Sequence, residues 1–198
     1  MHGLINRSVE CFIRDTYGKA TWLNALHDAN VPQKSFEGML HYDDHLTGDV
    51  ISATAQLLKR SESELLEDLG IYLVSHSNTQ ALRRLLRFGG VNFVDFLHSL
   101  DDLPGRARMA VADLDMPELE LHQTTREDFK LYVRSDKFSF GPIVLGALRA
   151  MADDYGALVV MSADGAGLQG ELISISVLSD SYTEGRSFQL SQPVAAHS

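Results

Sequence analysis

The sequence predicts an α+β fold, in which a helical N-terminal lobe precedes a four-stranded antiparallel sheet with one helix packed on it. Up to about residue 110, apolar residues recur at spacings of three and four, the period of an amphipathic helix. From about residue 117 the spacing changes to two, which is typical of strands that bury one face. One helical segment, roughly residues 142–155, interrupts the strands, so helices and strands are expected to form separate layers.

The helical part is divided by residues that begin or end helices. Gly18 ends the first helix, and Pro32 separates the second from the next. Ser61 and Glu64 have the spacing of a capping box, in which both side chains accept hydrogen bonds from exposed backbone N–H groups. The expected helices cover residues 4–17, 22–26, 47–60, 61–73, 82–86 and 93–103.

Alternating apolar residues predict the strands, and Asp164-Gly165 supplies a turn before the last one. Residues 165–170 (GAGLQG) also match the G-x-G-x-x-G pattern of dinucleotide sites. Such a site needs a helix directly after the glycines, and here a strand pattern follows, so we interpret the segment as a hairpin loop. The strand positions are Leu119 and Leu121, then Phe129, Leu131 and Val133, then residues 159–161, and finally Ile173, Ile175 and Val177.

The charge balance excludes several classes of partner. The chain of 198 residues has 17 Lys and Arg against 27 Asp and Glu, a formal net charge of −10. Nucleic acid and anionic membranes are therefore excluded as main partners, since both attract clustered cations. The longest apolar runs, such as residues 157–161, are far shorter than the ~20 residues of a membrane helix, and we expect a cytoplasmic protein.

Isolated reactive side chains give no site by themselves. Cys11 is the only cysteine, which excludes an internal disulfide and a cysteine metal cluster. His41 and His45 could place two imidazoles on one helical face, but no third ligand is apparent and a surface charge cluster explains them equally well. We therefore predict neither a metal site nor an enzyme.

Several short motifs, taken in order, resemble one family. The first six residues, MHGLIN, are similar to its M-K-G-x-I start, and residues 14–18 (RDTYG) resemble the end of its first helix. Residues 90–97 (GVNFVDFL) and 100–103 (LDDL) resemble its proximal helix. The family is that of the heme nitric oxide/oxygen binding domains (H-NOX or HNOB), related to the heme domain of soluble guanylate cyclase. The resemblance spans roughly residues 1–180, and we expect residues 181–198 to form a flexible C-terminal tail.

The resemblance places a proline where the family has its iron ligand. The residue after the LDDL run is a histidine in the family, whereas here it is Pro104, whose side chain has no donor atom. At about 100° per residue, position 104 continues the apolar face of a helix that begins at Phe93. His98 is an alternative as a metal ligand, although it lies about 120° away around that helix, and His122 on the first strand is a more remote one.

The resemblance also implies the rest of a heme pocket. Val133, Ser135 and Lys137 fall on the propionate-binding Y-x-S-x-R motif, so its tyrosine is lost and its arginine is a lysine. Lysine can neutralise the charge of a propionate, but it cannot form the bidentate hydrogen bonds that arginine makes with a carboxylate. Tyr132 should face the opposite side of the strand, and Tyr72 stays open as a distal donor. The remaining pocket positions are Pro117, similar to a family proline that packs on the macrocycle, and the apolar residues Ile5, Val9, Leu73, Leu97 and Leu100.

Two functions from different classes follow from the resemblance. In the first, an H-NOX-type sensory domain holds heme through apolar and propionate contacts and senses NO. In the second, a heme-free signalling or protein-interaction module keeps the fold and binds another apolar or anionic ligand. Both are regulatory domains, and the resemblance implies a signalling enzyme as partner, such as a nucleotide cyclase, a cyclic-di-nucleotide enzyme or a histidine kinase.

Overall fold

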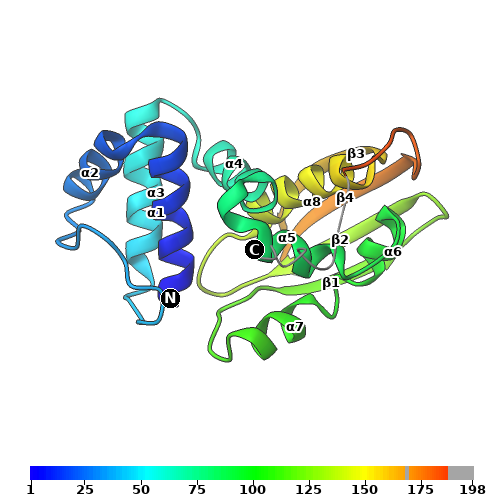
Figure 1. Cartoon of the computed structure of the whole chain (residues 1–198), viewed down its shortest axis with the longest axis horizontal. Helices are drawn as coiled ribbons and strands as arrows, with labels where there is room; N and C mark the ends of the chain where they lie inside the picture. Colours follow the sequence, from blue (N-terminus) through cyan, green and yellow to red (C-terminus); the bar gives the residue numbers. More distant parts are fainter. Residues whose placement is uncertain (168–169, 187–198) are drawn as a thin grey trace, which may run out of the picture.

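The computed structural model describes residues 1–167 and 170–186, and it confirms the α+β fold. Helices come first and strands follow, with one helix between the second and third strands (Figure 1). The four strands form one antiparallel sheet in the order β1-β2-β4-β3. In chain order the elements are α1 (Gly3–Tyr17), α2 (Lys19–Asp28), α3 (His45–Leu58), α4 (Glu62–Ser75), the 3-10 helix η1 (Ser77–Thr79), α5 (Gln80–Arg87), α6 (Phe93–His98), α7 (Leu103–Ala110), β1 (Glu118–Gln123), β2 (Asp128–Arg134), α8 (Gly141–Tyr155), β3 (Leu158–Gly167) and β4 (Gly170–Ser179).

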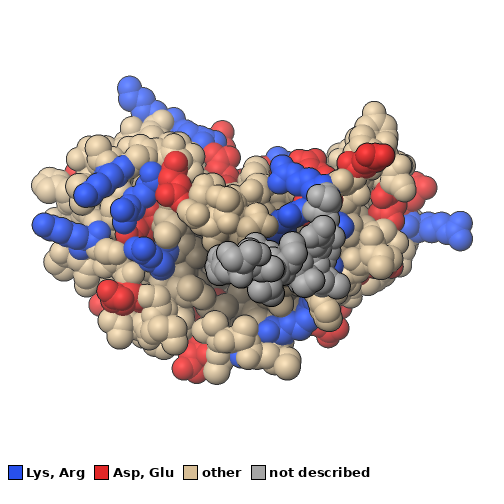
Figure 2. Space-filling model, viewed as in Figure 1, with Lys and Arg blue, Asp and Glu red and all other residues tan. Residues whose placement is uncertain are grey.

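The molecule has two lobes that meet through α4 (Figure 1). The helical lobe consists of α1, α2 and α3, and the sheet lobe consists of the four strands with α5 to α8. Lys and Arg side chains gather over the helical lobe on the face shown in Figure 2, although the chain has a net charge of −10. On this face, positive side chains are therefore prominent on the helical lobe despite the net negative charge. None of the described helices is long and apolar enough to cross a membrane.

The predicted alternation sets the buried face of the sheet. Phe129, Leu131 and Val133 of β2 are at most 1% exposed. Across the strand pair, Phe129 lies opposite Ile175 and Leu131 lies opposite Ile173, and both isoleucines are also 1% exposed. Because α8 packs against β3 and β4, this face forms the core of the sheet lobe.

Local capping signals place the helix that joins the lobes. The Ser61 hydroxyl accepts a hydrogen bond from the Glu64 backbone N–H at 3.2 Å, and the Glu64 carboxylate accepts one from the Ser61 N–H at 3.0 Å. The capping box predicted from their spacing is therefore confirmed, and α4 begins directly after Ser61.

Two glycines allow α4 and α8 to approach each other closely. A Cβ atom added at Gly70 of α4 would overlap the backbone carbonyl of Ile143, and one added at Gly146 of α8 would overlap that of Glu67. Each glycine therefore lies against the backbone of the facing helix. Arg149 of α8 also forms an ion pair with Glu67. This contact joins the sheet lobe to the helix that packs on α1.

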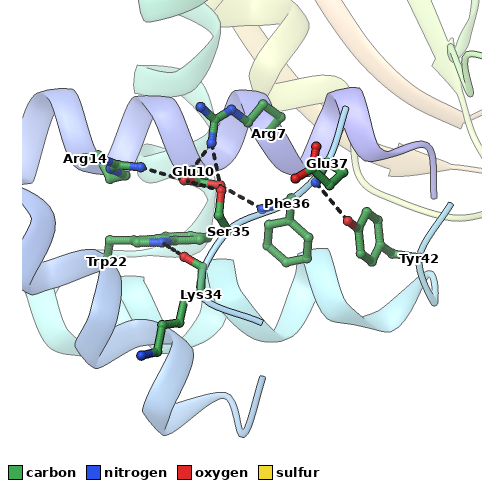
Figure 3. A network of polar contacts seen from close by, with 9 residues as sticks. All are labelled: Arg7, Glu10, Arg14, Trp22, Lys34, Ser35, Phe36, Glu37 and Tyr42. Carbon is green, nitrogen blue, oxygen red and sulfur yellow. Dashed lines mark hydrogen bonds and ion pairs between the residues drawn. The ribbon is translucent and has the colours of Figure 1, made fainter. Parts of the chain in front are cut away.

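A buried carboxylate holds the loop between α2 and α3 on α1 (Figure 3). The Glu10 side chain is fully buried and accepts hydrogen bonds from the Phe36 backbone N–H (2.9 Å) and the Ser35 hydroxyl (3.0 Å). The guanidinium groups of Arg7 and Arg14 donate to it at 2.8 and 2.7 Å. Burial raises the pKa of Glu10, but these hydrogen bonds outweigh burial and keep the pKa below its ordinary value. Glu10 is therefore ionised inside the helical lobe.

The tryptophan of the chain packs against the same loop (Figure 3). Trp22 is 1% exposed, and its Nε1–H donates to the Lys34 carbonyl at 3.0 Å. Its ring meets the Phe36 ring with 6.0 Å between centroids, and Phe36 in turn meets Tyr42 at 4.9 Å. The core of the helical lobe therefore includes this loop as well as the helices.

The helix predicted over residues 93–103 is wrong in its length. The segment forms two helices, because α6 ends at His98 and α7 begins at Leu103. Pro104 lies in the first turn of α7, where a missing N–H loses no helical hydrogen bond. Between the helices, the N–H groups of Leu100 and Leu103 bond to carbonyls three residues back, at 3.1 and 3.0 Å. Position 104 therefore does not continue the apolar face of α6.

The glycine-rich segment belongs to a hairpin, as predicted. β3 and β4 pair antiparallel as far as Gly167 opposite Gly170. Gly165 has φ +90° and Gly170 has φ +104°, conformations that favour glycine. Leu168 and Gln169 lie outside the described residues. The G-x-G-x-x-G match is thus not followed by the helix that a dinucleotide site requires.

Residues 181–186, where we expected the tail to begin, are attached to the domain. Tyr182 and Thr183 donate backbone hydrogen bonds to the Gly156 carbonyl, and Arg186 donates one to the Asp154 carbonyl at 2.9 Å. The Asp154 carboxylate is itself buried and lies 2.7 Å from the guanidinium of Arg83 on α5. The rest of the expected tail, residues 187–198, lies outside the described residues.

Replacing Gly70 or Gly146 by alanine should destabilise the protein by about 1–3 kcal/mol, because the added methyl must displace the facing backbone. Gly48 in α3 is the matched control, since open space surrounds the position of its Cβ. Gly48→Ala should stabilise by about 0.5–1 kcal/mol through helix propensity. Urea unfolding followed by circular dichroism measures all three variants. If Gly70→Ala left the free energy of unfolding unchanged, the close contact between α4 and α8 would be contradicted.

Glu10→Gln should lower the free energy of unfolding at neutral pH by about 1–3 kcal/mol, because an amide satisfies the two guanidinium groups poorly. Since the folded pKa of Glu10 is lowered, its contribution is present above the unfolded value of ~4.3 and is lost as the pH falls through the folded pKa. The difference between wild type and variant should therefore shrink in acid. Urea unfolding across pH measures it, with exposed Glu37→Gln as the control. A difference independent of pH would mean that Glu10 is not ionised.

Candidate functional site

The apolar positions of the implied heme pocket lie inside a continuous core. Ile5 and Leu73 are half-buried against this core. The other side chains are buried in the core, so a flat macrocycle would have to separate them from their neighbours to contact them. These four residues, each at most 2% exposed, are Val9, Leu97, Leu100 and Val133.

The two prolines of the implied pocket are buried as well. Pro104 lies in the first turn of α7, and Pro117 lies directly before β1. Neither ring carries an atom that could bind iron. Both positions therefore contribute apolar packing and no metal ligand.

The side chains that could replace the lost ligand or tyrosine lie elsewhere. His98 is exposed, and its ring meets Phe129 edge-on with 5.7 Å between centroids. Tyr132 meets the exposed His122 at 5.2 Å, whereas the neighbouring Val133 is buried in the core. The register thus turns Tyr132 away from the side that Val133 faces, as predicted.

Tyr72, which the sequence left open as a distal donor, is directed toward α1. Its ring stacks on His76 with 4.5 Å between centroids and contacts Phe12 at 5.5 Å. Its hydroxyl donates to the Asp15 carboxylate at 2.7 Å. Burial and this carboxylate raise the pKa of Tyr72 above its ordinary value, so the hydroxyl keeps its proton. Tyr72 therefore ties α4 to α1.

A pocket of about 530 Å³ lies where the loop before β1 meets the chain after β2. It brings together Ser135 and Lys137, whereas the other eight predicted pocket positions do not line it. Its apolar lining residues are Met1, Ala112, Leu114, Met116 and Phe140. Its charged lining residues are four carboxylates, Asp113, Asp115, Glu118 and Asp136, and three cations, Arg108, Arg134 and Lys137.

Lys137 is already paired with carboxylates. Its ammonium group lies 3.2 Å from the Asp115 carboxylate and 3.9 Å from that of Asp44. The hydrogen bond to Asp115, with the charge of Asp44, raises the pKa of Lys137. Lys137 is therefore charged, and an incoming anion has to compete with Asp115 for it.

Arg108 and Asp115 are pocket residues that the sequence did not indicate. Asp115 meets Lys137 across 22 positions of sequence, and the loop that carries it has no regular hydrophobic period. Arg108 is exposed near the end of α7, where nothing in its spacing sets it apart from other surface arginines. No local signal could have identified either residue.

Comparison with known proteins identifies the family. A family model described as Haem-NO-binding (HNOB) matches residues 2–163. The chain belongs to this family. The HNOB domain is 22% identical over 155 residues to soluble guanylate cyclase 89Db of Drosophila melanogaster, and 24% identical over 154 residues to soluble guanylate cyclase gcy-31 of Caenorhabditis elegans. Each match covers 78% of the chain but only 23% and 22% of those relatives, so the chain spans less than a quarter of their length.

Solved H-NOX structures share this fold. A mutant H-NOX protein from S. oneidensis superposes with a TM-score of 0.77 at 16% identity, covering 91% of this chain and 97% of that one. A mutant H-NOX protein from K. algicida gives 0.78 at 13% identity, covering 92% and 99%. The predicted H-NOX fold, helical lobe first and sheet second, is therefore confirmed.

The residues of this HNOB domain do not fit iron-ligated heme. Pro104, which the resemblance places at the family's ligand position, is buried in the first turn of α7 and has no donor atom. The side chains that would contact the macrocycle are closed against one another, and Lys137 is held by Asp115. The described lining of the pocket contains no imidazole or thiolate. The donor atoms, burial and charge pairing of these residues thus do not suit a heme whose iron is bound by the protein.

Lys137→Ala should weaken binding of anilinonaphthalene sulfonate, an aromatic anion, about three- to tenfold, because one charge-assisted contact is lost. Asp115→Asn should strengthen binding, since it frees Lys137 from its nearest carboxylate. Lys130→Ala is the control, because Lys130 is exposed on β2 and does not line the pocket. Isothermal titration calorimetry measures the affinities. Equal affinities in all variants would mean that the pocket does not receive anions through Lys137.

Proposed function

We propose that this HNOB domain is a regulatory domain that works without iron-ligated heme and controls a partner signalling enzyme. The observation that carries the proposal is the buried Pro104 in the first turn of α7. The family resemblance implies a mechanism in which NO weakens an iron–histidine bond and so releases the proximal helix. Since Pro104 has no donor atom, no such bond can join iron to this segment. NO therefore has no covalent means of moving α6.

Packing holds α6 in place of a metal bond. Phe93 and Phe96 are at most 2% exposed, and both rings contact Tyr155 of α8, with 6.2 and 5.8 Å between centroids. The Phe93 backbone N–H also donates to the Asp180 carboxylate at 3.0 Å. A change in α6 must therefore come from a molecule that binds one arrangement of the domain better than another.

The pocket beside Ser135 and Lys137 is our candidate site for a regulatory ligand. Its lining combines apolar residues, among them Leu114, Met116 and Phe140, with three cations and four carboxylates. A small molecule with an apolar body and one anionic group would pack on the apolar residues and pair with a cation, in competition with the carboxylates. This is the heme-free hypothesis drawn from the sequence. The alternative, in which heme is held by apolar and propionate contacts alone, would require the core around Leu97 to open.

The proposed partner is a nucleotide cyclase or another signalling enzyme. The matched segment makes up less than a quarter of the soluble guanylate cyclases to which the chain is similar. A domain of this kind can act on such an enzyme in the same chain or in a separate one. A cyclic-di-nucleotide enzyme and a histidine kinase are the other partner classes. All act on nucleotides, and we place the domain with them in the cytoplasm.

Heme titration of the purified protein tests the proposal. Wild type should give no saturable Soret band at one heme per chain. Pro104→His supplies an imidazole at the family's ligand position and should bind heme roughly tenfold more tightly or better. Pro142→His is the matched control, because Pro142 also lies in the first turn of a helix, and it should behave as wild type.

The outcomes separate the possible causes. A wild-type Soret band that saturates at one heme per chain would overturn the proposal. Binding only by Pro104→His would mean that the missing ligand is what excludes heme. Absence of binding in all three proteins would mean that the closed core excludes heme as well, and heme-independent function would still stand.

A further inference from the structure

The two edge strands of the sheet, β1 and β3, differ in how well they are protected. Along β1, Glu118, Glu120 and His122 place polar or charged side chains at the edge. The Leu121 backbone N–H donates to the Asp101 carboxylate at 2.8 Å. Charged side chains and covering groups are the usual means by which proteins keep edge strands from pairing with other chains. These groups therefore keep the β1 edge from pairing with a strand of another chain.

β3 lacks this protection over residues 158–163. This segment, LVVMSA, contains no charged residue and no proline. Among the residues that the structure describes, none outside the sheet forms a backbone hydrogen bond with it. Val160 is 58% exposed and Leu178 of the adjacent β4 is 57% exposed, whereas Ile175 on the inner face is 1% exposed. Unpaired backbone groups and apolar side chains are thus both available along this edge.

The regular part of β3 is short and bounded at both ends. Register shifts interrupt its pairing with β4 between Leu158 and Val159, and again between Ala163 and Ala166. The regular run, residues 159–163, is therefore centred on Met161. A partner strand must be regular over the same five residues, and a second copy of this run meets that condition by symmetry.

We propose that β3 pairs antiparallel with β3 of a second copy of this chain, about a two-fold axis through Met161. Opposite residues in an antiparallel pair point to the same face, so odd positions must meet odd ones and even positions even ones. An axis at Met161 satisfies this rule and gives one continuous sheet with both buried faces on the same side. The opposed pairs are Met161 with its own copy, Val160 with Ser162, and Val159 with Ala163.

The absence of charge along this edge permits a second copy to approach. Two chains that each carry −10 repel each other, so they approach most easily where no carboxylates oppose one another. In the proposed register Asp164 lies opposite Leu158, outside the regular run, and no two carboxylates meet. The exposed Val160 side chain, next to the axis, would be partly removed from water by the facing strand.

Sedimentation equilibrium tests the proposed pairing. Wild type should show a reversible monomer–dimer equilibrium. Val160→Lys combined with Ser162→Lys places lysines opposite lysines and should weaken association roughly tenfold or more. Val160→Lys combined with Ser162→Glu places lysine opposite glutamate twice and should restore association. Val91→Lys, at a valine that is 88% exposed on the loop before α6, is the matched control and should leave association unchanged.

A crosslink gives an independent readout of the register. In a Cys11→Ser background, Met161→Cys should form a disulfide-linked dimer on oxidation, whereas Val91→Cys should not. Circular dichroism confirms that each variant is folded. A wild-type protein that is monomeric at every concentration would overturn the proposal. So would a dimer that the lysine pair and Val91→Lys weaken equally, or one whose charge-opposed variant associates no better than the lysine pair.

Discussion

The architecture depends on the close crossing of α4 and α8. Gly70 and Gly146 each lie against the backbone of the opposite helix, so no side chain separates the two axes at that point. α8 covers the inner face of the sheet, and α4 packs on α1. The crossing is therefore the place where the cores of the two lobes are joined. The pocket is lined from both lobes at a different place, since Met1 comes from the helical side and Ser135 from the sheet side, and none of its lining residues belongs to α4 or α8.

The two contacts of α4 differ in kind. Toward α8 the fit is set mainly by missing side chains at Gly70 and Gly146, with the Arg149–Glu67 ion pair beside them. Toward α1 it includes polar groups: the Tyr72 hydroxyl on Asp15 and the Tyr17 hydroxyl 3.3 Å from the Asp68 carboxylate. Backbone packed on backbone cannot slide without overlap, whereas hydrogen-bonded side chains can exchange partners with water. Relative movement of the lobes is therefore easier at the α1–α4 contact than at the α4–α8 contact.

Properties that depend on neighbouring residues could be predicted from the sequence, and those that depend on the path of the chain could not. The period change near residue 117 and the capping box at Ser61 are local, and both gave the correct elements. The apolar stripe from Phe93 does not reveal the break after α6, because proline is compatible with the end of one helix or the start of the next. The family motifs drew attention to Lys137, but its partner Asp115 comes from a loop without a regular hydrophobic period.

The position of the single tryptophan makes the lobes optically distinguishable. Trp22 is buried in the helical lobe against Phe36, and its indole N–H is bonded to the loop that Glu10 holds. Indole emission therefore reports on this lobe alone, while most of the far-ultraviolet signal of strands comes from the other. Cooperative unfolding of the whole domain would make the two signals change together. Separate melting of the helical lobe would be visible as an earlier change in emission.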